Sequence, residues 1–304
     1  MTVAGKSLKL THLSKVFYPE EGYTKRDLLN YYDAVADLIL PHLKDRPLSL
    51  KRYPNGIREE YFFQKNVPRD QARRLRTVPI YHEENEGAAT NYAFADDRAA
   101  LLYLVNWGCI DQNPWISRIE SLDCPDWMLI DLDPQECPYE MIVEAAVLVK
   151  KHLDALGMQG YPKTTGGDGM HIYVPVEPVY GYDDARNFAE LLARLAIHER
   201  PDLFTTPRSV AARKKGKVYF DYLQNARGKT IAAPYVLRAH PGAPVSTPLA
   251  WEEVKKGLHP GQFHIRNAPA RFARTGDLFA GVLGKPQRLE RALERLDGLF
   301  GATR

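Results

Sequence analysis

Two aspartates stand two residues apart in the otherwise apolar segment "WMLIDLDPQE", residues 127–136. Because successive side chains of a strand point to opposite faces, Asp131 and Asp133 would share one face. Carboxylates held so close repel each other unless a proton or a cation lies between them. Mg²⁺ and Mn²⁺ prefer carboxylate oxygens, so the pair predicts a divalent-metal site. The alternative is a strand end at which both acids meet solvent.

A third acid, Asp221, lies in the apolar segment "KVYFDYLQN". An acid in such a strand is costly unless it is paired, bound to metal or exposed at an edge. Three strand-borne acids that meet in space would form a two-metal site for phosphoryl or nucleotidyl transfer. A lone aspartate on an edge strand is the alternative.

A glycine-rich turn, "KTTGGDGMHIYVP", lies between these two segments. Gly166 and Gly167 allow the backbone to turn tightly and to offer its N–H groups to an anion. Thr165 adds a hydroxyl, and His171 at the start of the next strand could contact a phosphate. The turn lacks the GK[ST] ending of a Walker A loop and does not match GxGxxG.

Basic and amide side chains surround the third acid. Gln224 and Arg238 follow Asp221 in a stretch that could neutralise a triphosphate, and Arg213 and Lys214 belong to the charged run "RSVAARKKGKVYF". That run indicates either contact with nucleic acid or a solvated hairpin turn. The net charge of +3 permits nucleic-acid binding without requiring it.

The segments that position these residues alternate between helix and strand patterns, which predicts an α/β or mixed α+β domain. A helix is expected over 24–40, where Thr24 and Asp27 fit a capping box and Pro41 is a stop signal. Further helices are expected over 139–157 and 182–199. Strands are expected over 126–133, 170–176 and 217–223, and strand-and-turn units over 47–56 and 59–66.

Three other segments complete the pattern. The apolar segment 99–108 could be helix or strand, and the proline-rich segment 239–270 is expected to be looped. A last amphipathic helix over 286–300 should turn Leu289, Leu293 and Leu296 inward.

Composition excludes some classes of protein. With 44% hydrophobic and 26% charged residues, the chain is typical of a soluble globular protein. It has no apolar run long enough to span a bilayer and no signal-peptide core near its start, so we expect a cytoplasmic, nucleoid-associated protein. Its three cysteines do not suggest a disulfide framework or a zinc site, and we expect them to be structural.

The motifs DLDP, TGGxGxH and FDYLQN, in this order and spacing, resemble the polymerase domain of bacterial ligase D. That domain belongs to the archaeo-eukaryotic primase superfamily and serves non-homologous end joining. The likeness covers nearly the whole chain, including "NWGCIDQNPW" and "DYLQNARGKTIAAPYVLRAHPGAPVSTPL". It implies one primase-polymerase catalytic domain over residues 1–304 with two interleaved lobes. A mixed central sheet would carry the acids, a second α/β lobe would pack against it, and a cleft would lie between them.

The resemblance also implies roles for individual residues. The catalytic and metal-binding acids would be Asp131, Asp133 and Asp221. The nucleotide-binding residues would be Lys51, Thr165, Gly166, Gly167, His171, Gln224 and Arg238. The DNA-binding residues would be Lys15, Lys25, Arg52, Phe62, Phe63, Arg213 and Lys214.

Within the DNA-binding set, Lys15 and Lys25 match residues that grip a 5′-phosphate, while Phe62 and Phe63 match an aromatic pair that stacks at the template bend. The chain departs from the pattern at two places. It has Asn113 where many relatives have histidine and Asp168 where some have lysine.

The function that the resemblance implies is nucleotide addition to a primer 3′-hydroxyl in gaps and at double-strand breaks, by a DNA-directed DNA/RNA polymerase. This implied activity includes template-directed synthesis, two Mn²⁺ or Mg²⁺ ions per site, and a preference for ribonucleotides and manganese. Template-independent addition is left open. The implied partners are gapped or broken DNA with a 5′-phosphate, NTP or dNTP, a Ku-like protein and a DNA ligase. No membrane is involved.

Three alternatives stay open at this point. A primase that starts chains without a primer would share every catalytic residue and would incorporate nucleotides on an unprimed template. A nuclease would use the same metals with water as the nucleophile and would shorten DNA instead of releasing pyrophosphate. A non-catalytic protein that bridges DNA ends would keep that activity without the three acids. Whether the chain is a stand-alone polymerase or an excised domain is also open.

Overall fold

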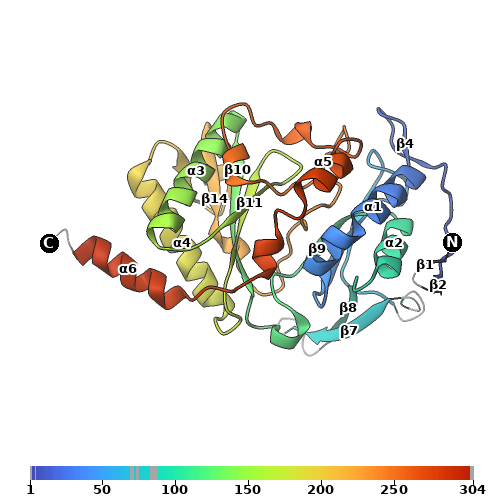
Figure 1. Ribbon diagram of the computed structural model, residues 1–304, viewed down its shortest axis with the longest axis horizontal. Coiled ribbons are helices and arrows are strands. Elements are labelled where there is room, and N and C mark those ends of the chain that lie inside the picture. Colours follow the sequence, from blue (N-terminus) through green and yellow to red (C-terminus); the bar gives the residue numbers. More distant parts are fainter. Residues whose placement is uncertain (1, 4, 69–71, 73–74, 83–87, 302–304) are drawn as a thin grey trace. The chain divides into compact units, whose positions relative to one another are not determined.

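The computed structural model describes the chain except for residues 1, 4, 69–71, 73–74, 83–87 and 302–304 (Figure 1). It has two compact units. The first unit comprises residues 1–120, 230–247 and 263–277, and the second comprises 121–229, 248–262 and 278–304. Each unit is therefore assembled from three separate chain segments, and each has helices and sheet of its own.

The first unit contains the helices α1 (Lys25–Leu43), α2 (Arg98–Asn106) and α5 (Ala268–Thr275). The capping box predicted for α1 is present, because Asp27 accepts hydrogen bonds from the backbone N–H and the hydroxyl of Thr24. The prediction that Pro41 ends this helix is wrong, since α1 continues to Leu43. The last turn is retained because His42 and Leu43 are fully buried there, and packing outweighs the hydrogen bond that proline removes.

The segment 99–108, which the sequence left open, is helical as α2. Its start is fixed by Asp97, whose carboxylate accepts a hydrogen bond from the N–H of Ala100 at 2.8 Å. One face of α2 packs against α1, and most of its apolar side chains are buried.

The strands of the first unit pair in antiparallel fashion. The largest sheet has the order β6-β5-β8-β7, with β9 also paired to β5. Its strands are β5 (Leu48–Arg52), β6 (Phe62–Gln64), β7 (Arg76–Tyr81), β8 (Ala89–Phe94) and β9 (Cys109–Pro114). Two short hairpins add β1 (Thr2–Val3) with β2 (Lys6–Ser7) and β3 (Val16–Tyr18) with β4 (Tyr23–Thr24).

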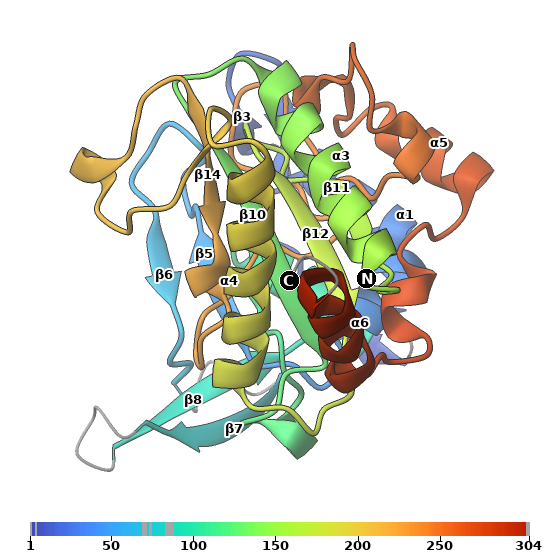
Figure 2. The ribbon, with the colours of Figure 1, turned by 90° about the vertical axis from the view of Figure 1, so that its left-hand side faces the viewer.

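The second unit is built on one mixed sheet with the order β11-β12-β10-β14-β13, in which only the β13–β14 pair is parallel. Its strands are β10 (Trp127–Gln135), β11 (Tyr161–Thr164), β12 (Met170–Pro175), β13 (Phe204–Thr205) and β14 (Lys217–Asp221). Helices α3 (Tyr139–Ala155) and α4 (Tyr182–Glu199) cover one face of it (Figures 1 and 2).

The side chains at even positions of the central strands face these helices. A Cβ atom added to Gly160 would lie within 4 Å of Leu153 of α3 and of the β12 residues Ile172 and Val174. The apolar even positions of β10, which include Ile130 and Leu132, are likewise fully buried. The odd positions of β10 and β12 therefore point to the opposite face of the sheet.

Helix α6 (Leu289–Gly301) closes the chain. Leu289 and Leu296 are buried as predicted, but the prediction for Leu293 is wrong, because it is 42% exposed and Ala292 is buried in its place. Spacings of three and four residues give the inward stripe Leu289, Ala292 and Leu296, and Leu293 lies at its margin.

The proline-rich stretch is mostly irregular, as predicted, with 3₁₀ turns at Trp251–Glu253 and Pro260–Gln262. Further 3₁₀ turns lie at Ile119–Ser121, Val210–Ala212, Tyr222–Gln224 and Ala280–Leu283. All three cysteines are free thiols, and Cys109 is buried. Within the described part of the chain, no helix combines the length and the apolar character needed to cross a bilayer.

Candidate active site

The central strand β10 places the first aspartate between two chemically important neighbours. Asp131 lies directly opposite His171 of β12 on one side and directly opposite Asp221 of β14 on the other. Residues opposite each other in antiparallel strands project from the same face, with Cβ atoms about 5 Å apart. The Nε2 atom of His171 lies 3.3 Å from Oδ1 of Asp131. We call these three residues the acid row.

The second aspartate lies next to this row. Asp133 follows Asp131 by two positions on β10 and is paired with Tyr219 of β14, so it shares the face of the acid row. This is the face turned away from α3. The same-face placement that the sequence predicts for Asp131 and Asp133 is therefore observed, and Asp221 joins them through the strand register.

The acid row fits a hard divalent cation in its chemistry. Within the described residues, no three acid, histidine or cysteine side chains already surround one point as a complete metal site. However, Oδ1 of Asp221 is buried and has no hydrogen-bond donor among them. A buried carboxylate oxygen without a donor is costly, and a cation held between Asp221 and Asp131 would satisfy it with the oxygen ligands that Mg²⁺ and Mn²⁺ prefer.

The glycine turn between β11 and β12 packs directly on the acid strand. A Cβ atom added to Gly169 would lie 2.6 Å from the carbonyl oxygen of Leu132 and 2.9 Å from Oδ1 of Asp133. Only glycine therefore fits at position 169 without displacing one of these groups. The sequence predicted a tight turn but not this contact.

The hydroxyl of Thr165 organises this turn. Its oxygen accepts hydrogen bonds from the N–H groups of Gly167 at 3.1 Å and Gly169 at 3.2 Å, and Gly166 has a φ of 71°. For these two N–H groups, the expectation that the glycine backbone is directed at an anion is wrong in this structure. The hydroxyl of Thr165 competes for them because it lies within the turn itself.

Two residues that the sequence analysis did not select support this face of the sheet. Lys163 of β11 is fully buried and lies opposite His171, with its Nζ 5.8 Å from the ring centre of Tyr173. Asn225 exchanges two 2.7 Å hydrogen bonds with the backbone of Leu129, which attaches the turn after Asp221 to β10. In the sequence, Lys163 could have been identified from its place two residues before Thr165. No local feature of the sequence pointed to Asn225.

Arg213 and Lys214 lie in the segment 206–216 that leads into β14, where residues 207–212 are exposed. The guanidinium carbon of Arg213 lies 3.4 Å from the ring centre of Tyr219. Burial, and to a smaller extent the charge of Asp221, raises the pKa of Tyr219 to about 12. The sequence analysis missed Tyr219, whose only distinguishing feature in the sequence is that it stands two residues before Asp221 and so shares its face of the strand.

In the first unit, three predicted cations form a cluster. Lys15 donates hydrogen bonds to the carbonyl of Pro54 at 2.7 Å and to Oδ1 of Asn55 at 2.5 Å. Lys25 is nearly buried, and burial followed by the charges of Lys15 and Arg52 lowers its pKa to about 8. Like charges held so close favour the binding of an anion, which would reduce their repulsion.

The predicted aromatic pair lies beside this cluster on β6. Phe62 and Phe63 are 45% and 58% exposed. The Arg52 guanidinium lies 5.2 Å from the ring centre of Phe62 and donates to the carbonyl of Trp107. Lys51 lies 4.5 Å from the ring centre of Tyr61. Large exposed rings next to cations are the combination that stacks on nucleic-acid bases.

A buried acid, Asp111, is the neighbour of the remaining predicted cations of this unit. Its Oδ2 accepts a 3.1 Å hydrogen bond from Nε of Arg238, and it lies opposite Lys51 in the β5–β9 pairing. Burial lowers the pKa of Lys51, and the charge of Asp111 raises it. At the position where many relatives have histidine, Asn113 donates from Nδ2 to the carbonyl of Asp111 at 3.1 Å. In the segment "DQNPW", the sequence analysis had selected Asn113 but not Asp111.

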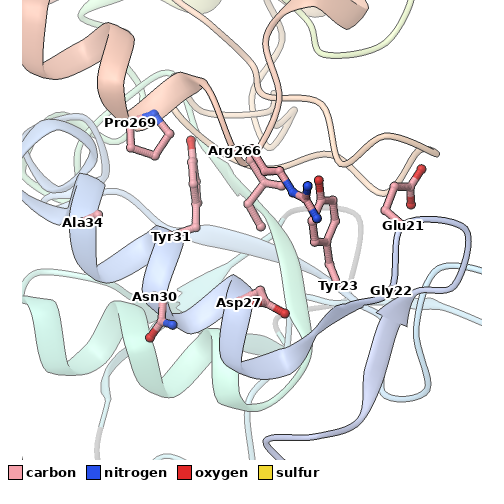
Figure 3. A pocket seen from close by; sticks show the side chains of 10 residues that line it. Glu21, Gly22, Tyr23, Asp27, Asn30, Tyr31, Ala34, Arg266 and Pro269 are labelled. Carbon is pink, nitrogen blue, oxygen red and sulfur yellow. The ribbon is translucent and has the colours of Figure 1, made fainter.

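The predicted site residues are thus divided between the units. The second unit contains Asp131, Asp133, Thr165, Gly166, Gly167, His171, Arg213, Lys214, Asp221 and Gln224, and the first contains Lys15, Lys25, Lys51, Arg52, Phe62, Phe63 and Arg238. A pocket of about 500 Å³ in the first unit is lined by residues between 21 and 34 and between 265 and 269, with Arg266 over the ring of Tyr23 in its wall (Figure 3). None of the predicted site residues lines it.

The chain is similar in sequence to known proteins. It is 36% identical over 282 residues to the bifunctional non-homologous end joining protein LigD of Bacillus subtilis, covering 92% of this chain and 45% of that protein. It is 32% identical over 298 residues to the multifunctional non-homologous end joining protein LigD of Pseudomonas aeruginosa, covering 96% of this chain and 35% of that protein. The chain thus spans less than half the length of these relatives.

A solved structure agrees with these relatives. The polymerase domain from Mycobacterium tuberculosis ligase D, in complex with DNA, superimposes with a TM-score of 0.85 at 28% identity, covering 92% of this chain and 99% of that one. The profile of the family described as the LigD primase-polymerase domain matches residues 24–279. The chain therefore belongs to the LigD primase-polymerase domain family.

Proposed function

We propose that this chain is a DNA-repair nucleotidyltransferase that extends a primer 3′-hydroxyl in gaps and at double-strand breaks during non-homologous end joining. The observation that carries the proposal is the acid row, in which Asp131 lies opposite both Asp221 and His171. Family membership supplies the reaction class. The relatives are named as end-joining proteins, and the M. tuberculosis domain was solved with DNA.

Asp131, Asp133 and Asp221 are the residues that would hold Mn²⁺ or Mg²⁺. Two such ions, if bound there, would lower the pKa of the attacking hydroxyl and offset the charge of the leaving pyrophosphate. His171, whose Nε2 lies 3.3 Å from Oδ1 of Asp131, is the neighbour of that carboxylate that can donate to a phosphate oxygen from the same face. Thr165 and Gly169 keep the turn pressed on β10, which holds Asp133 in place.

The remaining predicted residues have binding roles in this proposal. Lys51 and Arg238 neutralise nucleotide phosphates, and the buried carboxylate of Asp111 is the neighbour of both. Lys15 and Lys25 hold the 5′-phosphate of the strand beyond a gap, so their loss should weaken binding to phosphorylated ends and reduce its salt dependence. The exposed rings of β6 stack on a template base.

Finer properties complete the proposal. We infer a preference for ribonucleotides and a preference for manganese. The candidate contact for the 2′-hydroxyl is the Thr165 hydroxyl, which accepts a hydrogen bond from Gly169 in the turn that packs on β10. A Ku-like protein and a DNA ligase activity are the partners that end joining requires. The named relatives are longer proteins described as bifunctional or multifunctional.

Primer extension on a gapped duplex tests this function, with ribo- and deoxyribonucleotides compared in Mn²⁺ and in Mg²⁺. Asp131→Asn should reduce extension by roughly a hundredfold or more, because several kcal/mol of transition-state stabilisation depend on the metal, while DNA affinity stays near that of the parent. Asp183→Asn on α4, where the carboxylate is 79% exposed, is the matched control and should extend normally. Full extension by Asp131→Asn would refute the proposal, and synthesis on an unprimed template would favour a primase.

A further inference from the structure

Three aromatic rings of the first unit surround the ammonium group of Lys51. Its Nζ lies 4.5 Å from the ring centre of Tyr61, 5.4 Å from that of Tyr53 and 5.8 Å from that of Phe63. A cation within about 6 Å of a ring centre is attracted by the π electrons of that ring. We call these three rings the lysine cage.

The lysine cage is assembled from residues that lie close together in the sequence. Phe63 of β6 lies directly opposite Lys51 of β5, so both side chains project from one face of the sheet. Tyr53 follows β5 and is buried, and its ring stacks on that of Tyr61 at 5.1 Å with 29° between the planes. The ring of Tyr61 in turn meets that of Phe63 edge-on at 6.1 Å. Tyr61 is therefore the ring that contacts both of the others, although it is 52% exposed.

A buried carboxylate is the alternative partner for this ammonium group. Asp111 of β9 lies opposite Lys51 on the other side of β5 and is 1% exposed. Its Oδ2 accepts the hydrogen bond from Arg238, but its Oδ1 is buried and has no hydrogen-bond donor among the described residues. The ammonium group of Lys51 therefore lies at the rings, although a carboxylate oxygen across the strand pair lacks a donor.

The two contacts would have different consequences for the binding of an anion. An ammonium group that pairs with a carboxylate has its charge compensated and gives up at least one of its three N–H donors. Contact with ring faces uses the charge alone and leaves the donors for another partner. A phosphate binds most strongly to a cation that can still donate hydrogen bonds to it. The lysine cage thus keeps Lys51 in the state that suits a phosphate.

We propose that Tyr61 is a positioning residue that holds the ammonium group of Lys51 at the lysine cage, away from Asp111, and so keeps it available to a nucleotide phosphate. Without this ring, Lys51 pairs with Oδ1 of Asp111 and the nucleotide binds more weakly. This inference rests on the nucleotide-binding role proposed for Lys51. The contact of Lys51 with the rings exists in the free protein, however, and is testable without nucleotide or DNA.

The contact is measured by nuclear magnetic resonance of the ε-methylene protons of Lys51, whose signal is assigned by its loss in Lys51→Arg. Ring currents move protons above a ring face upfield, so this signal should lie upfield of those of the exposed lysines. Tyr61→Phe keeps the ring and should keep the shift, whereas Tyr61→Leu should lose most of it. An ordinary lysine shift in the parent, or an unchanged shift in Tyr61→Leu, would overturn the placement of the ammonium group.

The consequence is measured as the affinity for ATP, by isothermal titration calorimetry in the presence of Mg²⁺. Tyr61→Leu should bind ATP about fivefold more weakly, the scale of one partly exposed cation–π contact, and Tyr61→Phe should match the parent. Tyr81→Leu, which removes a 64% exposed tyrosine from β7 of the same sheet, is the matched control and should bind normally. Parent-like binding by Tyr61→Leu, or an equal loss in Tyr81→Leu, would overturn the role of Tyr61.

The competing carboxylate is tested in a double-mutant cycle. In an Asp111→Asn background no carboxylate is left to pair with Lys51, so Tyr61→Leu should change the ATP affinity by less than about twofold. The same loss in both backgrounds would show that the ring acts independently of Asp111, and would overturn the competition between ring and carboxylate.

These readouts separate the inference from the proposed function. If Lys51→Met bound ATP like the parent, the nucleotide-binding role of Lys51 would fail, and with it the effect of Tyr61 on ATP, whereas the place of the ammonium group would stand on its resonance. If Lys51→Met lost ATP affinity while Tyr61→Leu matched the parent in both resonance and affinity, only the positioning role would fail.

Discussion

Raising the pH should weaken the hold of Lys25 on a 5′-phosphate. Lys25 is nearly buried, and burial together with the charges of Lys15 and Arg52 lowers its pKa to about 8. Only the protonated amine attracts the phosphate. We therefore expect the preference for a phosphorylated over an unphosphorylated gap to fall as the pH rises through this value.

The size of the effect follows from the shifted pKa. With a pKa near 8, roughly nine-tenths of Lys25 is charged at pH 7 and about one-tenth at pH 9, so the preference should fall roughly tenfold over this range. The phosphate has its second pKa near 6, so it stays a dianion throughout. A lysine whose folded pKa lies below its unfolded value stabilises the fold as pH rises from 8. Unfolding therefore does not account for the loss.

Fluorescence anisotropy with both gapped duplexes, from pH 7 to pH 9 at constant ionic strength, measures this preference. Lys25→Arg stays charged over the whole range, so its preference should be independent of pH. Lys25→Met should lose the preference at every pH. A parent preference that does not change with pH, or an equal fall in Lys25→Arg, would refute the role given to this amine.

Two further predictions concern the neighbours of the predicted residues. Asp111→Asn leaves the guanidinium of Arg238 without its buried partner and should lower the free energy of unfolding by about 2 kcal/mol in a urea titration; a change under about 0.5 kcal/mol would contradict the pairing. Gly169→Ala should displace Asp133, whose Oδ1 lies 2.9 Å from the new Cβ, and reduce both extension and Mn²⁺ affinity by about tenfold. Gly181→Ala, whose Cβ meets nothing nearer than 3.7 Å, is its control, and equal behaviour of the two variants would contradict the prediction.

Local patterns predicted most of the elements that carry the candidate site. The helical periodicity of 139–157 and 182–199 matches α3 and α4, and the apolar segments around the acids match β10 and β14. The sequence misplaced the end of α1 at Pro41 and the inward face of α6 at Leu293. Both errors have one cause, because packing decides how far a helix continues and which side it buries.

Sequence patterns did not identify several residues that support the site. Nothing in the local sequence distinguishes Tyr219, Asp111 or Lys163 from other strand residues until their cross-strand neighbours are known. Each becomes important through a residue on another strand. A side chain that acts only through a cross-strand partner has no local signature, since the partner is far away in the chain.

By itself, the sequence determined that Asp131 and Asp133 share a face, because side chains along a strand alternate with a period of two. It also determined that a turn able to pass close to other backbone lies between the acid segments, because glycine lacks a Cβ. Only the tertiary structure decided that β10 lies between β12 and β14 in a register that sets Asp131 opposite both His171 and Asp221. Strand order and register arise from packing the whole sheet against α3 and α4, and a shift of one residue would turn the acids toward those helices.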